Sequence, residues 1–261
     1  MTDAGASLNN RTRWIELATS DPEKAQEFYS QLFGWRMDVS EDPQYGAYAM
    51  AMLGERPTAG IGAKQDPNMP DAWSLYIGTD DIDGLAAKIT DAGGTVIAPP
   101  FDVGDQGKMA VFQDPSGAFI SAWQGVGAAD FLYDANNSFG WAELTARGVQ
   151  DALPFYEKVF GWKTQTSDYN PPEPPYNEFI LDGESVLGAI EMSPEMPAQV
   201  PNYWQIYFQV EDVDATFANA MRLGATAMVP PQDFPGGRFA ILMDPQGANF
   251  ALLKVVPGTD R

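Results

Sequence analysis

One pattern occurs twice in this chain, and it limits the possible folds more than any other feature. Residues 14–35 read as a short strand, a turn, an amphipathic helix and a glycine stop. The pieces Trp-x-Glu-Leu, Phe-Tyr and Phe-Gly-Trp recur 127 residues later, at 141–144, 155–156 and 160–162. A repeat of this size in 261 residues indicates two copies of one domain.

The helix of the repeat has recognisable start signals. Either Ser20 caps the first helix and Glu23 completes a capping box, or Asp21 caps it with Pro22 at the first helical position. In the second copy Pro154 falls inside the corresponding helix, so we expect that helix to start late or to be kinked.

Each copy contains a second unit of the same kind. A strand, an Asp-x-Asp helix start and an Asp-Pro-x-Gly turn occur at 73–83 and 114–117, and again at 204–214 and 244–247. We therefore expect four modules, each a strand, a helix and about three strands, in the α+β class. The predicted boundaries are a flexible tail at 1–10, a first domain at 11–125, a linker at 126–137 and a second domain at 138–258.

Composition excludes several kinds of chemistry. The chain has no cysteine and no histidine. It therefore has no disulfide, no thiolate metal site and no cysteine nucleophile, and it lacks the commonest metal ligand and general base.

The formal charge of −21 bears on the partners of the protein. An acidic surface repels phosphate backbones and anionic lipid, so we expect no nucleic acid and no membrane among them. It would attract a cationic ligand, although solubility or a salty habitat explains the charge more simply. The polar start of the chain and the absence of a long apolar run predict a cytoplasmic location.

These motifs together resemble a known superfamily. The Phe-Tyr and Gly-Trp pairs, the Asp-x-Asp helix starts and the Asp-Pro-x-Gly turns are similar to those of the vicinal oxygen chelate superfamily, over about residues 12–125 and 139–256. It is also called the glyoxalase/bleomycin-resistance/dioxygenase fold. Within it, the chain looks like the tandem two-domain glyoxalase-like proteins of actinobacterial type. The resemblance implies four βαβββ modules paired into two glyoxalase-like domains, each with a curled mixed sheet around a cleft.

The resemblance does not extend to the metal ligands. In enzymatic members these come from the first strand of each unit and from the last strand. The matching positions here are Trp14, Ser74 and Ser121, and in the second copy Trp141, Gln205 and Ala251. Only Gln205 could ligate a metal, whereas a divalent ion needs three or four protein donors. We therefore predict no metal site and no cofactor.

Two glutamates are the candidate catalytic residues. Strand alternation places Glu16 with Trp14 on the face away from the helix, and Glu143 with Trp141 in the same way. Each could hydrogen-bond a ligand or act as a base. The alternative is a solvated glutamate or one paired with an arginine, for which the candidates are Arg13, Arg147 and Arg238.

Aromatic residues are expected to line the same clefts. By strand parity the candidate ligand-binding residues are Trp14, Tyr76, Trp123, Trp141, Gln205 and Tyr207, together with Arg238 as a possible anion contact. Such rings could stack on a flat or cationic ligand, or they could be ordinary core. Tyr48 and Tyr176, near the hairpins, could belong to lids or to plain loop packing.

Three functions remain open at this point. The leading hypothesis is a metal-free small-molecule binding protein that sequesters or carries an organic compound, for which an aromatic or cationic molecule is the candidate. The alternative is a glyoxalase-like isomerase, lyase or detoxifying enzyme that uses Glu16 or Glu143 as base. The third is a structural protein whose clefts are filled by Trp14 and Trp141. The expected assembly is a monomer or a weak homodimer.

Overall fold

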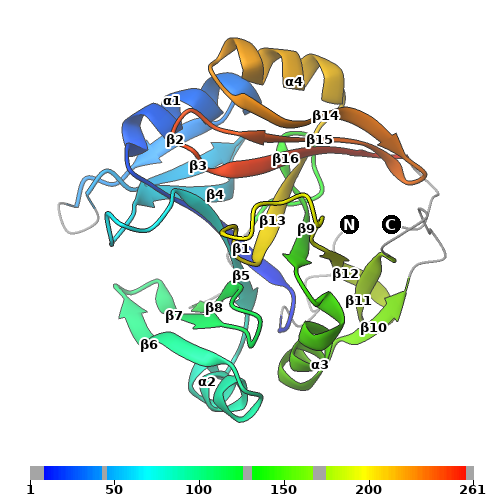
Figure 1. Cartoon of the computed structure of the whole chain (residues 1–261). Coiled ribbons are helices and arrows are strands. Elements are labelled where there is room, and N and C mark those ends of the chain that lie inside the picture. Colours follow the sequence, from blue (N-terminus) through cyan, green and yellow to red (C-terminus); the bar gives the residue numbers. More distant parts are fainter. Residues whose placement is uncertain (1–8, 43–45, 126–130, 167–174, 257–261) are drawn as a thin grey trace. The chain divides into compact units, whose positions relative to one another are not determined.

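The computed structural model describes residues 9–42, 46–125, 131–166 and 175–256. Its element order is four repeats of strand, helix and three strands, as Figure 1 shows. This confirms the α+β class and the four βαβββ modules predicted from the sequence. Within the described ranges, no helix is long and apolar enough to cross a membrane.

The elements of the four modules have these bounds. The first contains β1 (Thr12–Thr19), α1 (Pro22–Phe33), β2 (Arg36–Val39), β3 (Ala49–Leu53) and β4 (Arg56–Ala63). The second contains β5 (Ala72–Gly78), α2 (Ile82–Asp91), β6 (Thr95–Val103), β7 (Gly107–Gln113) and β8 (Phe119–Gly125). The third contains β9 (Ser138–Ala146), α3 (Val149–Phe160), β10 (Lys163–Thr166), β11 (Asn177–Leu181) and β12 (Glu184–Glu191). The fourth contains β13 (Tyr203–Gln209), α4 (Val213–Arg222), β14 (Thr226–Phe234), β15 (Gly237–Met243) and β16 (Asn249–Val255).

The strands form two eight-stranded mixed sheets. Their orders are β2-β3-β4-β1-β5-β8-β7-β6 and β10-β11-β12-β9-β13-β16-β15-β14. In each module the first strand pairs in parallel with the last, and the remaining pairs are antiparallel. The helix and the two strands that follow it form the long connection that this parallel pair requires.

Contacts divide the chain into two compact units that differ from the sequence repeat. Unit 1 comprises Met1–Arg13, Leu75–Ala129 and Glu143–Trp204, and unit 2 comprises Trp14–Ser74, Asp130–Ala142 and Gln205–Arg261. Unit 1 thus holds most of the second and third modules, with α2 against α3. Unit 2 holds most of the first and fourth modules, with α1 and α4 side by side (Figure 1). The predicted domain boundaries follow the repeat and stay a prediction.

The helix ends follow local sequence. Asp21 caps α1 by accepting the Lys24 N–H, and Pro22 is the first helical residue, so the second of the two predicted starts is the one adopted. The late start considered for α3 is wrong, because the helix begins at Val149 and contains Pro154. Its cap is remote: the Glu191 carboxylate accepts the backbone N–H groups of Gly148 and Val149.

The motifs of the repeat meet inside unit 2. The Tyr29 hydroxyl on α1 donates to Asp244 of the fourth module (3.0 Å), and the Trp73 indole N–H donates to the Tyr29 oxygen (3.0 Å). Burial raises the pKa of Tyr29 well above its ordinary value, so the phenol stays a donor. Asp244 also accepts the N–H groups of Gln246, Gly247 and Ala248.

Unit 1 repeats this arrangement with the equivalent residues. The Tyr156 hydroxyl on α3 donates to Asp114 (2.7 Å), and the Trp204 indole N–H donates to the Tyr156 oxygen (3.1 Å). The Phe-Tyr, Trp and Asp-Pro-x-Gly motifs are therefore explained by packing, because in each unit they form one buried polar contact that joins three modules.

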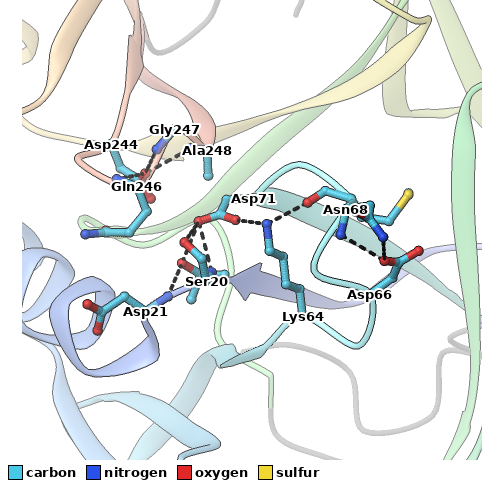
Figure 2. A network of polar contacts seen from close by, with 12 residues as sticks. Ser20, Asp21, Lys64, Asp66, Asn68, Asp71, Asp244, Gln246, Gly247 and Ala248 are labelled. Carbon is cyan, nitrogen blue, oxygen red and sulfur yellow. Dashed lines mark hydrogen bonds and ion pairs between the residues drawn. The ribbon is translucent and has the colours of Figure 1, made fainter.

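A second polar network in unit 2 fastens the loop before β5. Figure 2 shows Asp71 at its centre, accepting from Lys64 (2.8 Å) and from the N–H and hydroxyl of Ser20 (3.0 and 2.7 Å). Asp71 also accepts from the hydroxyl of Thr19 (3.0 Å). Lys64 also donates to the Met69 carbonyl (2.6 Å), which ties the loop to the end of β4. Burial pushes the pKa of Asp71 up, but these donors outweigh burial and hold it below the ordinary value.

We expect Asp71→Asn to destabilise the chain by about 2 kcal/mol at neutral pH, because an amide cannot accept all these donors. A depressed folded-state pKa adds stability above the unfolded value of 3.8, and this stability is lost as pH falls through the folded pKa. The difference in unfolding free energy between the native chain and the variant, measured by urea unfolding, should therefore become smaller below about pH 4. A difference in unfolding free energy that stays constant from pH 7 to pH 3 would contradict the lowered pKa of Asp71.

Candidate functional site

The two faces of β1 differ in what they carry. Ile15 and Leu17 are fully buried, whereas Trp14 and Glu16 on the opposite face are half-buried. Beside β1, the parallel strand β4 places Gly60 opposite Glu16. The predicted alternation of β1 is therefore present, and Trp14 and Glu16 share the face on which Gly60 leaves space.

Tyr48, just before β3, fills part of that space. Its hydroxyl donates to Glu16 Oε2 (3.1 Å) and hydrogen-bonds the side chain of Trp14, whose indole N–H can only donate. Burial, and then the nearby charge of Glu16, raise the pKa of Tyr48 well above its ordinary value. Tyr48 is thus a neutral phenol that links the carboxylate to the indole.

Two glycines of β4 make room for the Tyr48 ring. A Cβ at Gly60 would lie 2.2 Å from the Tyr48 oxygen, and one at Gly62 would lie 2.8 Å from its Cδ2. Real Cβ atoms essentially never come this close, so the ring lies directly on the backbone of β4. The Trp14, Glu16, Tyr48, Gly60 and Gly62 group is called the β1–β4 site below.

A segment expected to be a linker forms one wall of this site. The Phe131 ring is 5.5 Å from that of Trp14, centre to centre. Its backbone is held to the start of β4: Arg56 and Thr58 donate to the carbonyls of Phe131 and Leu132, and the Leu132 N–H donates to Pro57. The described part of the predicted linker, from residue 131, therefore belongs to unit 2, where it is packed against the start of β4.

The equivalent strands of the second copy are more crowded. Gly188 of β12 lies opposite Glu143 as Gly60 lies opposite Glu16, but Ile190 and Thr145 stand where the first copy has Gly62 and Ala18. Tyr203, near Glu143, hydrogen-bonds Thr145, and burial raises its pKa.

Several predicted cleft residues of the second copy lie in an apolar cluster of unit 2. Trp141 and Tyr207 are each only 7% exposed and pack with Ala251 and Leu253. Phe234, Phe239, Ile241 and Val255 surround them. For these two rings the structure therefore favours the alternative of ordinary core packing.

Tyr76 and Trp123 lie on one face of unit 1. Tyr76 of β5 is opposite Ser121 of β8, and Trp123 lies two residues further along β8 on the same face. Tyr76 is buried and Trp123 is half-buried.

Two of the three arginines considered as partners or anion contacts, Arg238 and Arg147, bind other groups. Arg238 donates to Asp214 through two nitrogens (2.7 and 2.8 Å) and to Asp233 (2.8 Å), so two carboxylates already hold the predicted anion contact. These bonds raise its pKa. Arg147 donates to the carbonyls of Pro197 and Val200. The Arg13 side chain is buried, which lowers its pKa.

The donors at the superfamily's metal positions do not fit a divalent ion. Five of the six residues are tryptophan, serine or alanine without a strong ligand atom, as at Trp14 and Ala251. The amide nitrogen of Gln205 donates to the Ile206 carbonyl (3.1 Å), and its buried Oε1 has no hydrogen-bond partner among the described residues. In the described ranges, His, Cys, Asp and Glu side chains form no group of three or more that could hold a metal.

Sequence reasoning named Tyr48 but did not join it to Glu16. The signal was present: β4 carries Gly-Ile-Gly at 60–62, and small residues at alternate positions leave one face of a strand open. The register that sets this face against Glu16 is a tertiary feature, which the sequence alone does not give.

Comparisons with known proteins agree with the fold. The sequence model of the Glyoxalase/Bleomycin resistance protein/Dioxygenase superfamily matches residues 11–121 and 138–252. "Putative glyoxylase CFP32" of Mycobacterium tuberculosis is 39% identical over 254 residues, covering 94% of each chain. "Anthracycline biosynthesis protein DnrV" of Streptomyces peucetius is 32% identical over 260 residues, covering 94% of this chain and 93% of that protein.

Solved structures show the same fold at much lower identity. The Mn(II)-bound glyoxalase from Novosphingobium aromaticivorans matches with a TM-score of 0.65 and 16% identity, covering 97% of this chain and 86% of that chain. The 2,2',3-trihydroxybiphenyl 1,2-dioxygenase from Sphingomonas wittichii matches with a TM-score of 0.65 and 14% identity, covering 94% and 91%. By its repeated modules, its sheet order and these matches, the chain belongs to the Glyoxalase/Bleomycin resistance protein/Dioxygenase superfamily.

Proposed function

We propose that this chain binds an organic molecule with a flat aromatic part and a cationic or hydrogen-bond-donating group, and that it does so without a divalent metal. The observation that carries the proposal is the β1–β4 site, where the half-buried Glu16 carboxylate lies beside the rings of Trp14 and Tyr48. A carboxylate accepts charge-assisted hydrogen bonds, and aromatic faces attract flat or cationic groups.

Two further facts support this choice of ligand. The net charge of −21 favours the approach of cations. A relative of 32% identity is named for anthracycline biosynthesis, and an anthracycline is a flat polycyclic compound. The donor set at the superfamily's metal positions, described above, favours recognition by side chains alone.

Calorimetric titration with three anthraquinones, which share one ring system, tests this proposal. One carries an ammonium group, one is uncharged and one carries a sulfonate, and all are titrated at low salt with a chelator present. We expect the cationic compound to bind at least about tenfold more tightly than the sulfonate, and added salt to reduce this preference. Absence of heat with all three, or tighter binding of the sulfonate, would contradict the proposal.

The hydrogen bond between Tyr48 and Glu16 also favours a second candidate function. A carboxylate next to a neutral phenol can take a proton from carbon while the phenol donates one to oxygen, as an isomerase or lyase requires. With chelator present, NMR would follow deuterium uptake at the carbon next to a carbonyl, in a panel of ketones and thiol adducts of 2-oxoaldehydes. Uptake that persists in the double variant Glu16→Gln, Glu143→Gln would exclude both glutamates as bases.

A further inference from the structure

The two copies of the repeat are not equivalent around their glutamates. In the first copy the Tyr48 ring lies on Gly60 and Gly62, and its hydroxyl reaches Glu16. Tyr176 holds the same place before β11 that Tyr48 holds before β3. The strand beside Glu143, however, has Ile190 where β4 has Gly62.

This difference decides where a ring can lie. At Gly62 even one added carbon would come within 2.8 Å of the Tyr48 ring, and isoleucine adds four. A tyrosine therefore cannot lie over Ile190 as Tyr48 lies over Gly62. The predicted partners of Glu143 on the ligand face, Trp141 and Tyr207, are also packed into the apolar cluster of unit 2.

We propose that Tyr48, seated on Gly60 and Gly62, is the positioning residue that orients the Glu16 carboxylate for a cationic or donor-bearing ligand, and that the chain holds one such ligand, in its first half. This inference rests on the proposed function for the ligand. It goes further by assigning a role to Tyr48 and its glycine platform, and a stoichiometry of one.

In the proposed mechanism, three successive contacts position the Glu16 carboxylate. The glycines fix the height of the ring above β4, the Trp14 indole N–H fixes its oxygen, and the hydroxyl then fixes one oxygen of Glu16. A carboxylate whose rotamer is set before binding loses less conformational entropy when it meets a ligand. Tyr48 acts through Glu16 and need not touch the ligand itself.

Gly62→Ala tests the platform without removing any hydrogen-bonding group. The backbone of Gly62 is outside the left-handed region, so alanine introduces no backbone strain, and its effect comes from the displaced ring. Tyr48→Phe removes the hydroxyl and keeps the ring. Tyr176→Phe is the matched control in the second copy. Circular dichroism and thermal melting verify that each variant is folded.

Two measurements are made on the full chain and these three variants. The first is the 15N-resolved NMR signal of the Trp14 indole N–H, assigned by its loss in Trp14→Phe, and it requires no ligand. The second is calorimetric titration with the ammonium-bearing anthraquinone. We expect Gly62→Ala and Tyr48→Phe to move the Trp14 signal and to weaken binding about tenfold. Tyr176→Phe should do neither, and the native chain should bind one probe molecule.

Each outcome bears on a separate claim. A Trp14 signal that moves while affinity stays unchanged overturns the positioning role. Two probe molecules per chain, or equal weakening by Tyr176→Phe, overturns the single site. If the native chain binds no probe, the proposed function fails, and an unmoved Trp14 signal in Gly62→Ala would then overturn the platform geometry as well.

Discussion

Replacing Asp244 with alanine should cost the chain about 3–5 kcal/mol of unfolding free energy, which makes it the most damaging single change we expect. The carboxylate is buried in unit 2 and accepts from the Tyr29 hydroxyl and from three backbone N–H groups of its own turn. Alanine would leave these donors without a partner. The Tyr29 hydroxyl is fully buried, so it would lose its acceptor where water does not replace it.

Urea unfolding, followed by tryptophan fluorescence, measures this loss. Tyr29→Phe removes the bond from the hydroxyl to Asp244 and the acceptor of the Trp73 indole N–H, but it keeps the three backbone bonds to Asp244. It should therefore cost less, about 2 kcal/mol. Asp105→Ala, at an exposed turn residue, is the control for loss of a carboxylate and should change stability by less than about 0.5 kcal/mol. If Asp244→Ala were no more harmful than Asp105→Ala, the buried contact would not be what joins these modules.

The same residues show how far the sequence predicts the fold. The repeat, the helix starts and the turn motifs are local, and from them the four modules and their element order followed. The partner of Tyr29 did not follow, because Asp244 lies 215 residues away and belongs to the other copy. Local pattern identifies modules, whereas the choice of which modules pack together depends on contacts far apart along the chain.

Departures from the expected helix starts have the same origin. The late start considered for α3 came from Pro154, and the second copy also has Gly148 where the first has the capping side chain of Asp21. The structure supplies the cap from Glu191 at the end of β12, so the helix begins at the same place in both copies. A cap from a remote strand leaves no signal at the helix start.

In the candidate site too, local sequence pattern predicts some features and not others. Strand alternation was enough to put Trp14 and Glu16 on one face and Ile15 and Leu17 on the other. It could not separate a ring that lines a site from one that fills a core, because both occupy the same face. That distinction came from neighbours: Trp14 hydrogen-bonds Tyr48, which in turn donates to Glu16, whereas Trp141 packs in a buried cluster with Tyr207, Ala251 and Leu253.

Glu16→Gln should lower the affinity for the ammonium-bearing anthraquinone by about ten- to a hundredfold, since a charge-assisted contact becomes a neutral one. The uncharged anthraquinone depends on the rings rather than on the carboxylate, so its affinity should change by less than about threefold. Glutamine keeps the size of the side chain and an oxygen that can accept from Tyr48, so the β1–β4 site should stay assembled.

Glu143→Gln is the matched comparison for this experiment, because it makes the same change of charge at the equivalent strand position. Removing one charge from a chain of −21 alters its overall field only slightly, and equally in both variants. A difference between them therefore reports the local role of Glu16. We expect Glu143→Gln to bind the cationic compound within about threefold of the native chain, since Ile190 and Thr145 crowd its surroundings. Equal losses in the two variants would show that net charge, and not the pairing of Glu16 with Tyr48, attracts the ligand.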